Sequence, residues 1–190
     1  MVQAAATAYV PFEDYFAVEA TAPAEAARRE WYAGVVYAMS RGTPEHGRLT
    51  SRMTITLGTA LPARCQVYSS DTMLFIAQAE LATYADLSIV CGELTTVTVR
   101  THGKSLGQAV TNPSVIVEVL SESTERYDRD RKFTAYTQLA SLAEHVLVSQ
   151  DAPQIVVFRR DAGWAGTVAT AGMAVTILGA SIAVDAIYAR

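Results

Sequence analysis

Cysteine and histidine are scarce in this sequence, with two cysteines and three histidines in 190 residues. Cys65 and Cys91 are isolated, so they supply neither a disulfide framework nor the ligand set of a zinc site. Both stand in apolar, strand-like surroundings, and we expect them to be buried free thiols. A reducing cytoplasm fits this expectation.

Positive charge and long apolar runs are also lacking. The chain has 15 basic and 19 acidic residues, a net charge of -4. The molecule as a whole therefore has no electrostatic footprint for nucleic acid, and contact with a polyanion requires a local basic patch. Residues 1–10 lack the basic residues and the apolar block of a signal peptide. Residues 171–189 contain Asp185 and predict terminal strands and a short helix rather than a membrane span, so we expect a soluble protein.

The remaining composition, 51% hydrophobic and 18% charged, is that of a globular protein. The length and the lack of a repeat or linker predict a single domain over residues 1–190. Apolar periodicity predicts helices over residues 11–18, 46–61 and the end of 123–139. Strands are predicted at residues 31–39, 64–68, 73–76, 83–91, 114–121, 145–148, 155–158, 163–170 and 174–178. Residues 92–111 are predicted to form a loop or a mobile hairpin. This order predicts an α/β or α+β domain on a mixed sheet.

One carboxylate interrupts the most apolar of these strands. In residues 114–121 the side chains around Glu118 are apolar at both odd and even positions, so both faces of the strand are apolar. This predicts a strand buried on both faces. Burying an ionised carboxylate there costs several kcal/mol, on the order of the usual desolvation penalty, unless something compensates. A bound cation or a water-filled cleft would compensate. The alternative is that Glu118 lies at the end of the strand and pairs with an arginine.

Two further charged residues fit the same chemistry. Asp86 stands near the start of a predicted buried strand, and Lys132 stands on the helix after Glu118, one turn beyond Asp128. Carboxylates on neighbouring strands can hold one or two divalent metal ions, and such an ion activates water and stabilises charge on a phosphoryl oxygen. A lysine can position that water. From spacing alone, this is only an outline of phosphodiester hydrolysis.

Four stretches of the chain carry a more specific signal. They resemble the signature blocks of the Uma-type restriction endonucleases, a bacterial family of the PD-(D/E)XK nuclease superfamily: Arg29 to Ser40 followed by Pro44-Glu-His46, Tyr84 to Cys91, Pro113 to Thr124, and Tyr127 to Tyr136. The resemblance runs from about Phe12 to Phe158. It implies a restriction-endonuclease-like mixed β-sheet flanked by helices, with its core at about residues 12–160.

The resemblance also implies roles for individual residues. Asp86 takes the place of the motif's aspartate, and Glu118 that of its second acidic residue. The motif's lysine normally follows two positions later, where Leu120 stands here, and Lys132 on the following helix takes its place. Glu30 matches an additional N-terminal glutamate that supports metal or water binding. Mg²⁺ or Mn²⁺ as cofactor, DNA as substrate and a homodimer are implied in the same way.

The sequence departs from the family pattern near two of these residues. Ala85 stands where the motif usually has proline, a residue that shapes the entry to the strand rather than doing chemistry. Ala33 and Val35 replace acidic residues often seen around Gly34. The residues needed for metal binding and catalysis are all present.

Other polar residues have both a functional and a structural interpretation. His46, at the start of its helix, contacts substrate or a proton relay, or it is structural. Asp71 is a further acidic ligand or a turn cap. Asp128 orients Lys132 or caps its helix. The basic residues of 126–132 contact backbone phosphates or form a solvated helix face.

The sequence therefore predicts a metal-dependent DNA endonuclease, with Asp86 and Glu118 as metal ligands, Lys132 as the catalytic cation and Glu30 in support. Residues 92–111 are expected to carry base specificity. The alternative is a nuclease-fold protein that no longer cuts and serves as a binding module. A nuclease acting on RNA or on branched DNA shares the same chemistry.

Overall fold

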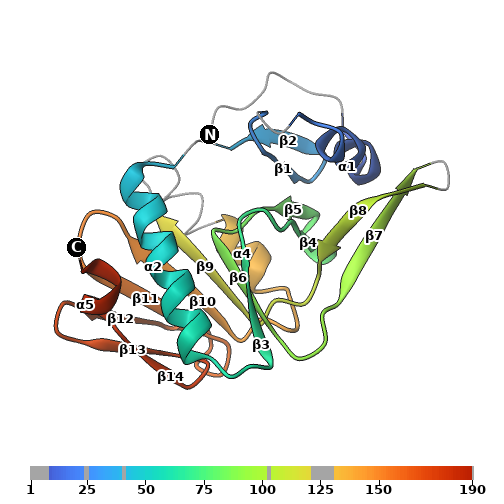
Figure 1. Ribbon diagram of the computed structural model, residues 1–190. Coiled ribbons are helices and arrows are strands. Elements are labelled where there is room, and N and C mark those ends of the chain that lie inside the picture. Colours follow the sequence, from blue (N-terminus) through green and yellow to red (C-terminus); the bar gives the residue numbers. More distant parts are fainter. Residues whose placement is uncertain (1–8, 24–25, 40–41, 102–103, 121–130, 190) are drawn as a thin grey trace.

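The computed structural model describes residues 9–23, 26–39, 42–101, 104–120 and 131–189. In this part of the chain the strands form two six-stranded sheets and a separate two-stranded hairpin (Figure 1). Both large sheets are mixed, because each contains one parallel pair of strands. The fold is therefore of the mixed α/β class that the sequence predicts.

The first sheet carries the N-terminal part of the chain. Its strands, in spatial order, are β2 (Val35–Ala38), β1 (Arg29–Tyr32), β5 (Leu81–Thr83), β4 (Leu74–Ile76), β8 (Lys104–Val110) and β7 (Thr96–Thr101). The short 3-10 helix η1 (Ala77–Ala79) joins β4 to β5. Strands β7 and β8 form a hairpin that extends away from the rest of the sheet, so residues 92–111 are largely a hairpin (Figure 1).

Helix α1 (Phe12–Ala20) covers one face of this sheet. Pro11 precedes it, and Glu13 and Asp14 stand in its first turn, where acidic side chains interact favourably with the helix dipole. Tyr15 and Phe16 are buried against the sheet in a cluster that includes Trp31, Ala82 and Val99. The apolar periodicity of residues 11–18 predicted this helix.

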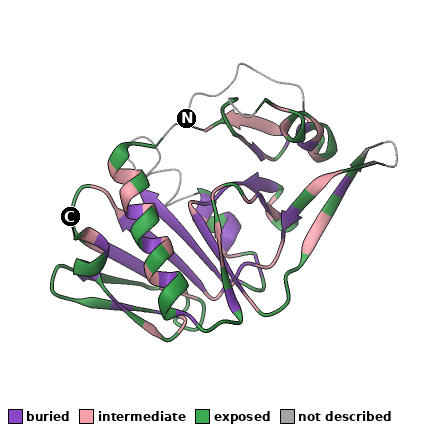
Figure 2. Ribbon diagram, in the orientation of Figure 1, coloured by how far each residue is buried: buried purple, intermediate pink, exposed green. Residues whose placement is uncertain are grey.

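The second sheet is the centre of the fold. Its strands, in spatial order, are β12 (Gly166–Thr170), β11 (Gln154–Arg159), β10 (Glu144–Ser149), β9 (Val115–Leu120), β6 (Leu87–Cys91) and β3 (Cys65–Ser69). All six residues of β9 are buried, and the neighbouring strands are also largely buried (Figure 2). This confirms a strand enclosed on both faces, with Glu118 in its interior rather than at its end.

Helix α2 (Pro44–Ala60) covers one face of the second sheet, with its outer side exposed (Figure 2). Thr43 caps its first turn, and Leu49, Met53 and Leu57, spaced four residues apart, are fully buried. The C-terminal hairpin of β13 (Ala174–Ile177) and β14 (Ala180–Ala183) packs on the same face with helix α5 (Val184–Tyr188). These elements match the terminal strands and short helix predicted from the sequence.

The opposite face of the second sheet meets helix α4 (Phe133–Tyr136) and the first sheet. Ile116 of β9 packs there with Tyr136 and with Leu81 of β5. Because side chains alternate along a strand, Glu118 lies on the same face as Ile116. The carboxylate of Glu118 is therefore directed into the layer between the two sheets.

One predicted strand differs from the structure, and one predicted contact cannot be compared with it. The strand predicted over residues 83–91 is divided at Asp86, with β5 in the first sheet and β6 in the second. The helix after Glu118 is described from Phe133, so Asp128 and its predicted relation to Lys132 lie outside the described residues. No helix in the described ranges is long and apolar enough to cross a membrane.

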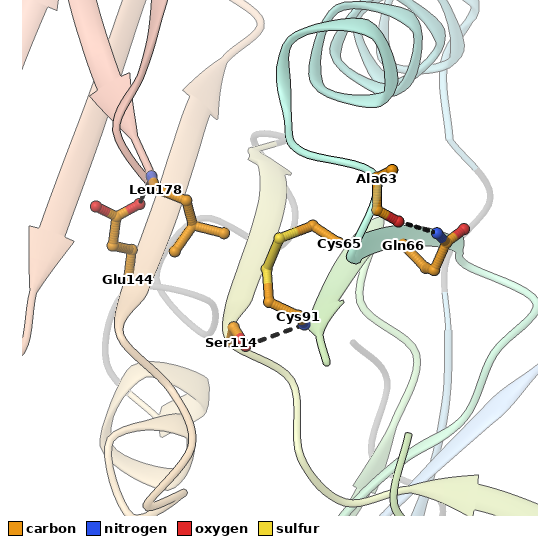
Figure 3. Close-up of a disulfide and its surroundings, with 7 residues drawn as sticks. All are labelled: Ala63, Cys65, Gln66, Cys91, Ser114, Glu144 and Leu178. Carbon is orange, nitrogen blue, oxygen red and sulfur yellow. Dashed lines mark hydrogen bonds between the residues drawn. A yellow bond between two sulfur atoms is a disulfide. The ribbon is translucent and has the colours of Figure 1, made fainter. Parts of the chain in front are cut away.

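The expectation of free thiols was wrong. Cys65 and Cys91 face each other in the antiparallel β3–β6 pair and form a disulfide, with 3.9 Å between their Cα atoms (Figure 3). Their separation of 26 positions in the sequence gives no sign of this proximity, because the register of the two strands brings them together.

The C-terminal hairpin is attached to β10 by a side-chain contact. The carboxylate of Glu144 accepts a hydrogen bond from the backbone N–H of Leu178 at 2.9 Å (Figure 3).

Candidate active site

Asp86 and Glu118 lie side by side where β6 begins next to β9. These strands are antiparallel neighbours, with Leu87 opposite Val117. The N–H of Asp86 lies 3.4 Å from Oε2 of Glu118, and the N–H of Val119 donates to Oδ2 of Asp86 at 2.7 Å. Each carboxylate thus accepts a backbone hydrogen bond from the strand that carries the other. This reciprocal pair fixes both carboxylates at one place.

Lys132 joins the two sheets through its ammonium group. Its Nζ lies 2.9 Å from Oε1 of Glu30 and 3.3 Å from Oε1 of Glu118. The side chains of all three residues are at most 6% exposed. Buried charges are costly unless they are paired, so the two carboxylates and the lysine stabilise one another. The four residues predicted from the sequence as a site are therefore neighbours in space.

Glu30, in β1, also receives a hydrogen bond from the neighbouring strand β5 of its own sheet. Thr83, at the end of β5, donates a hydrogen bond from its hydroxyl group to Oε1 of Glu30. The β1–β5 pairing produces this contact, because Trp31 lies opposite Ala82 and the preceding residue therefore faces Thr83. The Glu30 carboxylate thus contacts Thr83 on one side and Lys132 on the other, which fits a supporting position.

Tyr136 is a site residue that sequence reasoning missed. Its hydroxyl group donates to Oε1 of Glu118 at 2.7 Å, and the side chain is fully buried. Burial, reinforced by the nearby Glu118 carboxylate, raises the pKa of Tyr136 well above its usual value. The phenol therefore stays protonated and remains a donor. The interval of four residues from Lys132 to Tyr136 could have placed both side chains on one helix face.

His46 lies on the more exposed side of the site, next to Asp86. Its Nε2 lies 3.1 Å from the carboxylate of Asp86. The His46 and Asp86 side chains are 20% and 17% exposed, which makes them more accessible than Glu30, Glu118 and Lys132. A ligand from solvent would therefore reach Asp86 first.

The charges and donor types in this site suit a divalent cation. Three carboxylates and one ammonium group carry a formal charge of -2 when His46 is neutral. Within the described ranges, no group of three or more His, Cys, Asp or Glu side chains is arranged to hold a metal ion. Mg²⁺ commonly binds through one or two carboxylates and completes its shell with water and substrate phosphate. The Asp86–Glu118 pair fits that mode.

Several other candidates lie elsewhere. Asp71 forms an exposed ion pair with Arg28, so the structure gives it a surface contact rather than a place in the site. Arg131 is exposed, whereas the other arginines of the predicted basic cluster lie outside the described residues.

Comparison with known proteins identifies the family. Residues 12–182 match the Uma2 family model, which is described as "Putative restriction endonuclease". The chain belongs to the Uma2 family. It is 30% identical over 166 residues to the uncharacterized protein slr1290 of Synechocystis, covering 85% of this chain and 83% of the relative. It is also 30% identical over 124 residues to the uncharacterized protein sll1609 of the same organism, covering 65% and 67%.

A solved structure agrees with the fold. The crystal structure of a "putative nuclease belonging to DUF820" from Anabaena variabilis aligns with a TM-score of 0.67, at 12% identity, over 85% of this chain and 90% of that one. This likeness and the Uma2 match confirm the family and the mixed α/β fold predicted from the sequence. The roles of the individual site residues in this chain remain predictions.

Proposed function

We propose that this Uma2 protein is a metal-dependent endonuclease that hydrolyses phosphodiester bonds in DNA. The observation that carries the proposal is the convergence of Asp86, Glu118 and Lys132 from two strands and a helix onto one place. Two carboxylates beside a buried ammonium group are the components that such hydrolysis requires. The family description supports the same reaction class.

Asp86 and Glu118 would hold Mg²⁺ or Mn²⁺. When bound, the ion supplies an activated water molecule and stabilises negative charge on a phosphoryl oxygen. Glu118 is kept in place for this task by Lys132 and by the hydroxyl group of Tyr136. Asp86 is kept in place by the N–H of Val119.

Lys132 would act as a fixed positive charge next to the reacting phosphate. Its ammonium group lies 3.3 Å from Oε1 of Glu118, one of the two proposed metal ligands. From this place it would orient the attacking water or contact a phosphoryl oxygen as a point charge. Glu30 would not touch the substrate in this scheme, because it positions Lys132 from behind together with Thr83.

Calorimetric titration with Mn²⁺ and a plasmid-nicking assay test this proposal. The wild type should bind the ion and nick DNA, whereas Asp86→Asn and Glu118→Gln should lose both properties. Asp71→Asn is a matched control, because it removes an exposed acidic group that pairs with Arg28 outside the site. Unchanged metal binding in Asp86→Asn and Glu118→Gln would refute the assignment of the ligands.

A binding module without catalysis is the second candidate. Three of the four predicted site residues are nearly inaccessible and already paired with one another, and the chain carries a net charge of -4. Metal binding and DNA retention without any nicking would favour this function. A panel of duplex DNA, branched DNA and RNA would also separate the possible substrates.

The quaternary structure is a further part of the proposal. We propose one domain that assembles as a homodimer, on the basis of the chain length and the family resemblance. The expectation of a reducing cytoplasm rested on free thiols, and the Cys65–Cys91 disulfide removes that support. Light scattering on the purified protein would measure the mass directly. A single species of 20.4 kDa would exclude the dimer.

A further inference from the structure

We infer that His46 is a positioning residue that sets the orientation of the Asp86 carboxylate, and that a hydrogen-bonded brace of Thr43 and Gln150 holds it there. This inference rests on the proposed metal site. It begins from the contact of 3.1 Å between Nε2 of His46 and the carboxylate of Asp86.

The start of helix α2 determines where His46 lies. Thr43 is the N-cap, and its hydroxyl oxygen accepts a hydrogen bond from the N–H of His46 at 3.1 Å. Pro44 follows at the first helical position, where its fixed φ angle favours the helix. The backbone of His46 is therefore fixed in the first turn, with its side chain directed at Asp86.

The same cap is tied to the strand that carries Glu118. The Thr43 hydroxyl donates to Oε1 of Gln150 at 2.6 Å, and Nε2 of Gln150 donates to the carbonyl oxygen of Leu120 at 2.7 Å. Leu120 is the last residue of β9, two positions after Glu118. A continuous series of hydrogen bonds thus connects β9 with the turn that presents His46.

The effect of His46 follows from the number of donors around Asp86. The N–H of Val119 fixes Oδ2 of Asp86, and the Nε2–H of His46 supplies a second donor at the carboxylate. A neutral imidazole with its proton on Nε2 is sufficient for this. Two donors restrict rotation of the carboxylate before a cation arrives. Loss of a group that orients a metal ligand typically weakens metal binding by about 10- to 100-fold.

Mn²⁺ affinity, measured by calorimetry, tests the role of His46 without depending on cleavage. His46→Leu removes the donor and should weaken binding by roughly 10- to 100-fold. His46→Gln places an amide N–H near the position of Nε2 and should restore affinity to within about threefold of wild type, because the second donor is retained. A merely structural role for His46 would not produce this rescue.

The brace is tested in the same assay with the imidazole left intact. Gln150→Leu should weaken Mn²⁺ binding by about 3- to 10-fold, a smaller effect than that of His46→Leu because the helix cap remains. Thr59→Ala is the matched control, since Thr59 lies exposed near the other end of α2 and bonds only within the helix in the described contacts. Thermal melting without metal shows which variants are folded.

The outcomes distinguish this inference from the proposed function. If Asp86→Asn abolishes Mn²⁺ binding but His46→Leu and Gln150→Leu bind as wild type does, the role of His46 is wrong and the metal site stands. If the wild type binds no Mn²⁺, both proposals are wrong. A strong ¹⁴N coupling in pulsed electron paramagnetic resonance of bound Mn²⁺ would identify His46 as a direct ligand and overturn the positioning role.

Discussion

Two buried polar side chains on the same side of the second sheet have opposite surroundings. Glu118 of β9 receives hydrogen bonds from Tyr136, Lys132 and the backbone of Asp86. His145 of β10 lies opposite Ile116 and is fully buried, yet neither ring nitrogen has a hydrogen-bond partner within the described residues. Among the described residues, the same layer therefore holds one polar side chain with three hydrogen-bond donors and another without a partner.

The difference lies in what the surrounding elements contribute. Lys132 and Tyr136 supply donors to Glu118, whereas His145 is enclosed by the rings of Phe133, Tyr136 and Phe158. Burial, with a smaller contribution from the charge of Lys132, lowers the pKa of His145 to about 3. The imidazole is neutral at pH 7, and an aromatic enclosure can accommodate a neutral ring. Glu118, in contrast, depends on its partners.

Removing Lys132 should break this arrangement most severely. Lys132→Met leaves the carboxylates of Glu30 and Glu118 buried without their cation, and the loss should be about 3–5 kcal/mol of unfolding free energy. Urea denaturation measures it, with Arg131→Met as the control because Arg131 is the adjacent, exposed cation. A loss below 1 kcal/mol, on the order of a surface pair, would show that the buried ion pairs are dispensable.

Low pH should reduce the free energy of unfolding through His145. The pKa of His145 is about 3 in the folded protein and 6.5 in an ordinary setting, so between these values the unfolded chain binds more protons. Stability should therefore fall as the pH falls below 6.5, by about 1.4 kcal/mol per pH unit from this residue, or about 3 kcal/mol by pH 4.5.

The matched variant for this prediction is His145→Leu, which has no group to titrate. Carboxylates contribute equally to both proteins, so the difference between their stability curves from pH 7 to 4.5 isolates His145. Parallel curves would mean that the imidazole gains a proton or a partner in the folded state.

The hydroxyl group of Tyr136 should contribute less than the charge of Lys132. Tyr136→Phe keeps the ring contacts with His145 but removes one donor to Glu118, which should cost about 2 kcal/mol because the acceptor is charged. Tyr188→Phe is the control, since the Tyr188 hydroxyl bonds to uncharged backbone carbonyl groups and should contribute about 1 kcal/mol. Equal losses would argue against a special role for the Glu118 contact.

Thr83 should give the smallest effect of the series. Thr83→Val replaces its hydroxyl group with a methyl group of similar size, and Glu30 keeps its contact with Lys132. We expect a loss of about 1 kcal/mol, because the methyl group introduced at this fully buried position offsets part of the lost hydrogen bond to a charged acceptor. The same denaturation experiment measures it. A larger loss than that of Tyr136→Phe would place the main support of the site in the first sheet rather than in helix α4.

The parts of the fold that local pattern determines were predictable. Helices α1 and α2 and the doubly buried strand β9 follow from the spacing of apolar residues, which depends on neighbours only a few positions apart. The division of residues 83–91 between two sheets was not predictable, because it depends on strand pairing between distant segments. The Cys65–Cys91 disulfide was missed for the same reason.

The residues of the candidate site were likewise only partly predictable from the sequence. Glu118 stood out from the sequence because a carboxylate in an apolar strand is unusual. Asp86 and Lys132 were weaker candidates from their positions, and the family resemblance strengthened them and added Glu30. Tyr136 was missed as a site residue, because the direction of its hydroxyl group depends on how α4 packs against β9. The contact of His46 with Asp86 depends on the position of a whole helix relative to the sheet.

The placement of Lys132 outside β9 affects how such proteins can be recognised. The position two residues after Glu118 is Leu120, which packs with Leu147 and Val156, while the cation enters from a separate element. A search for a short sequence motif in which an acidic residue is followed two positions later by lysine would not find this chain. Relationships among such proteins are then better identified from which side chains meet in space than from the number of residues between them in sequence.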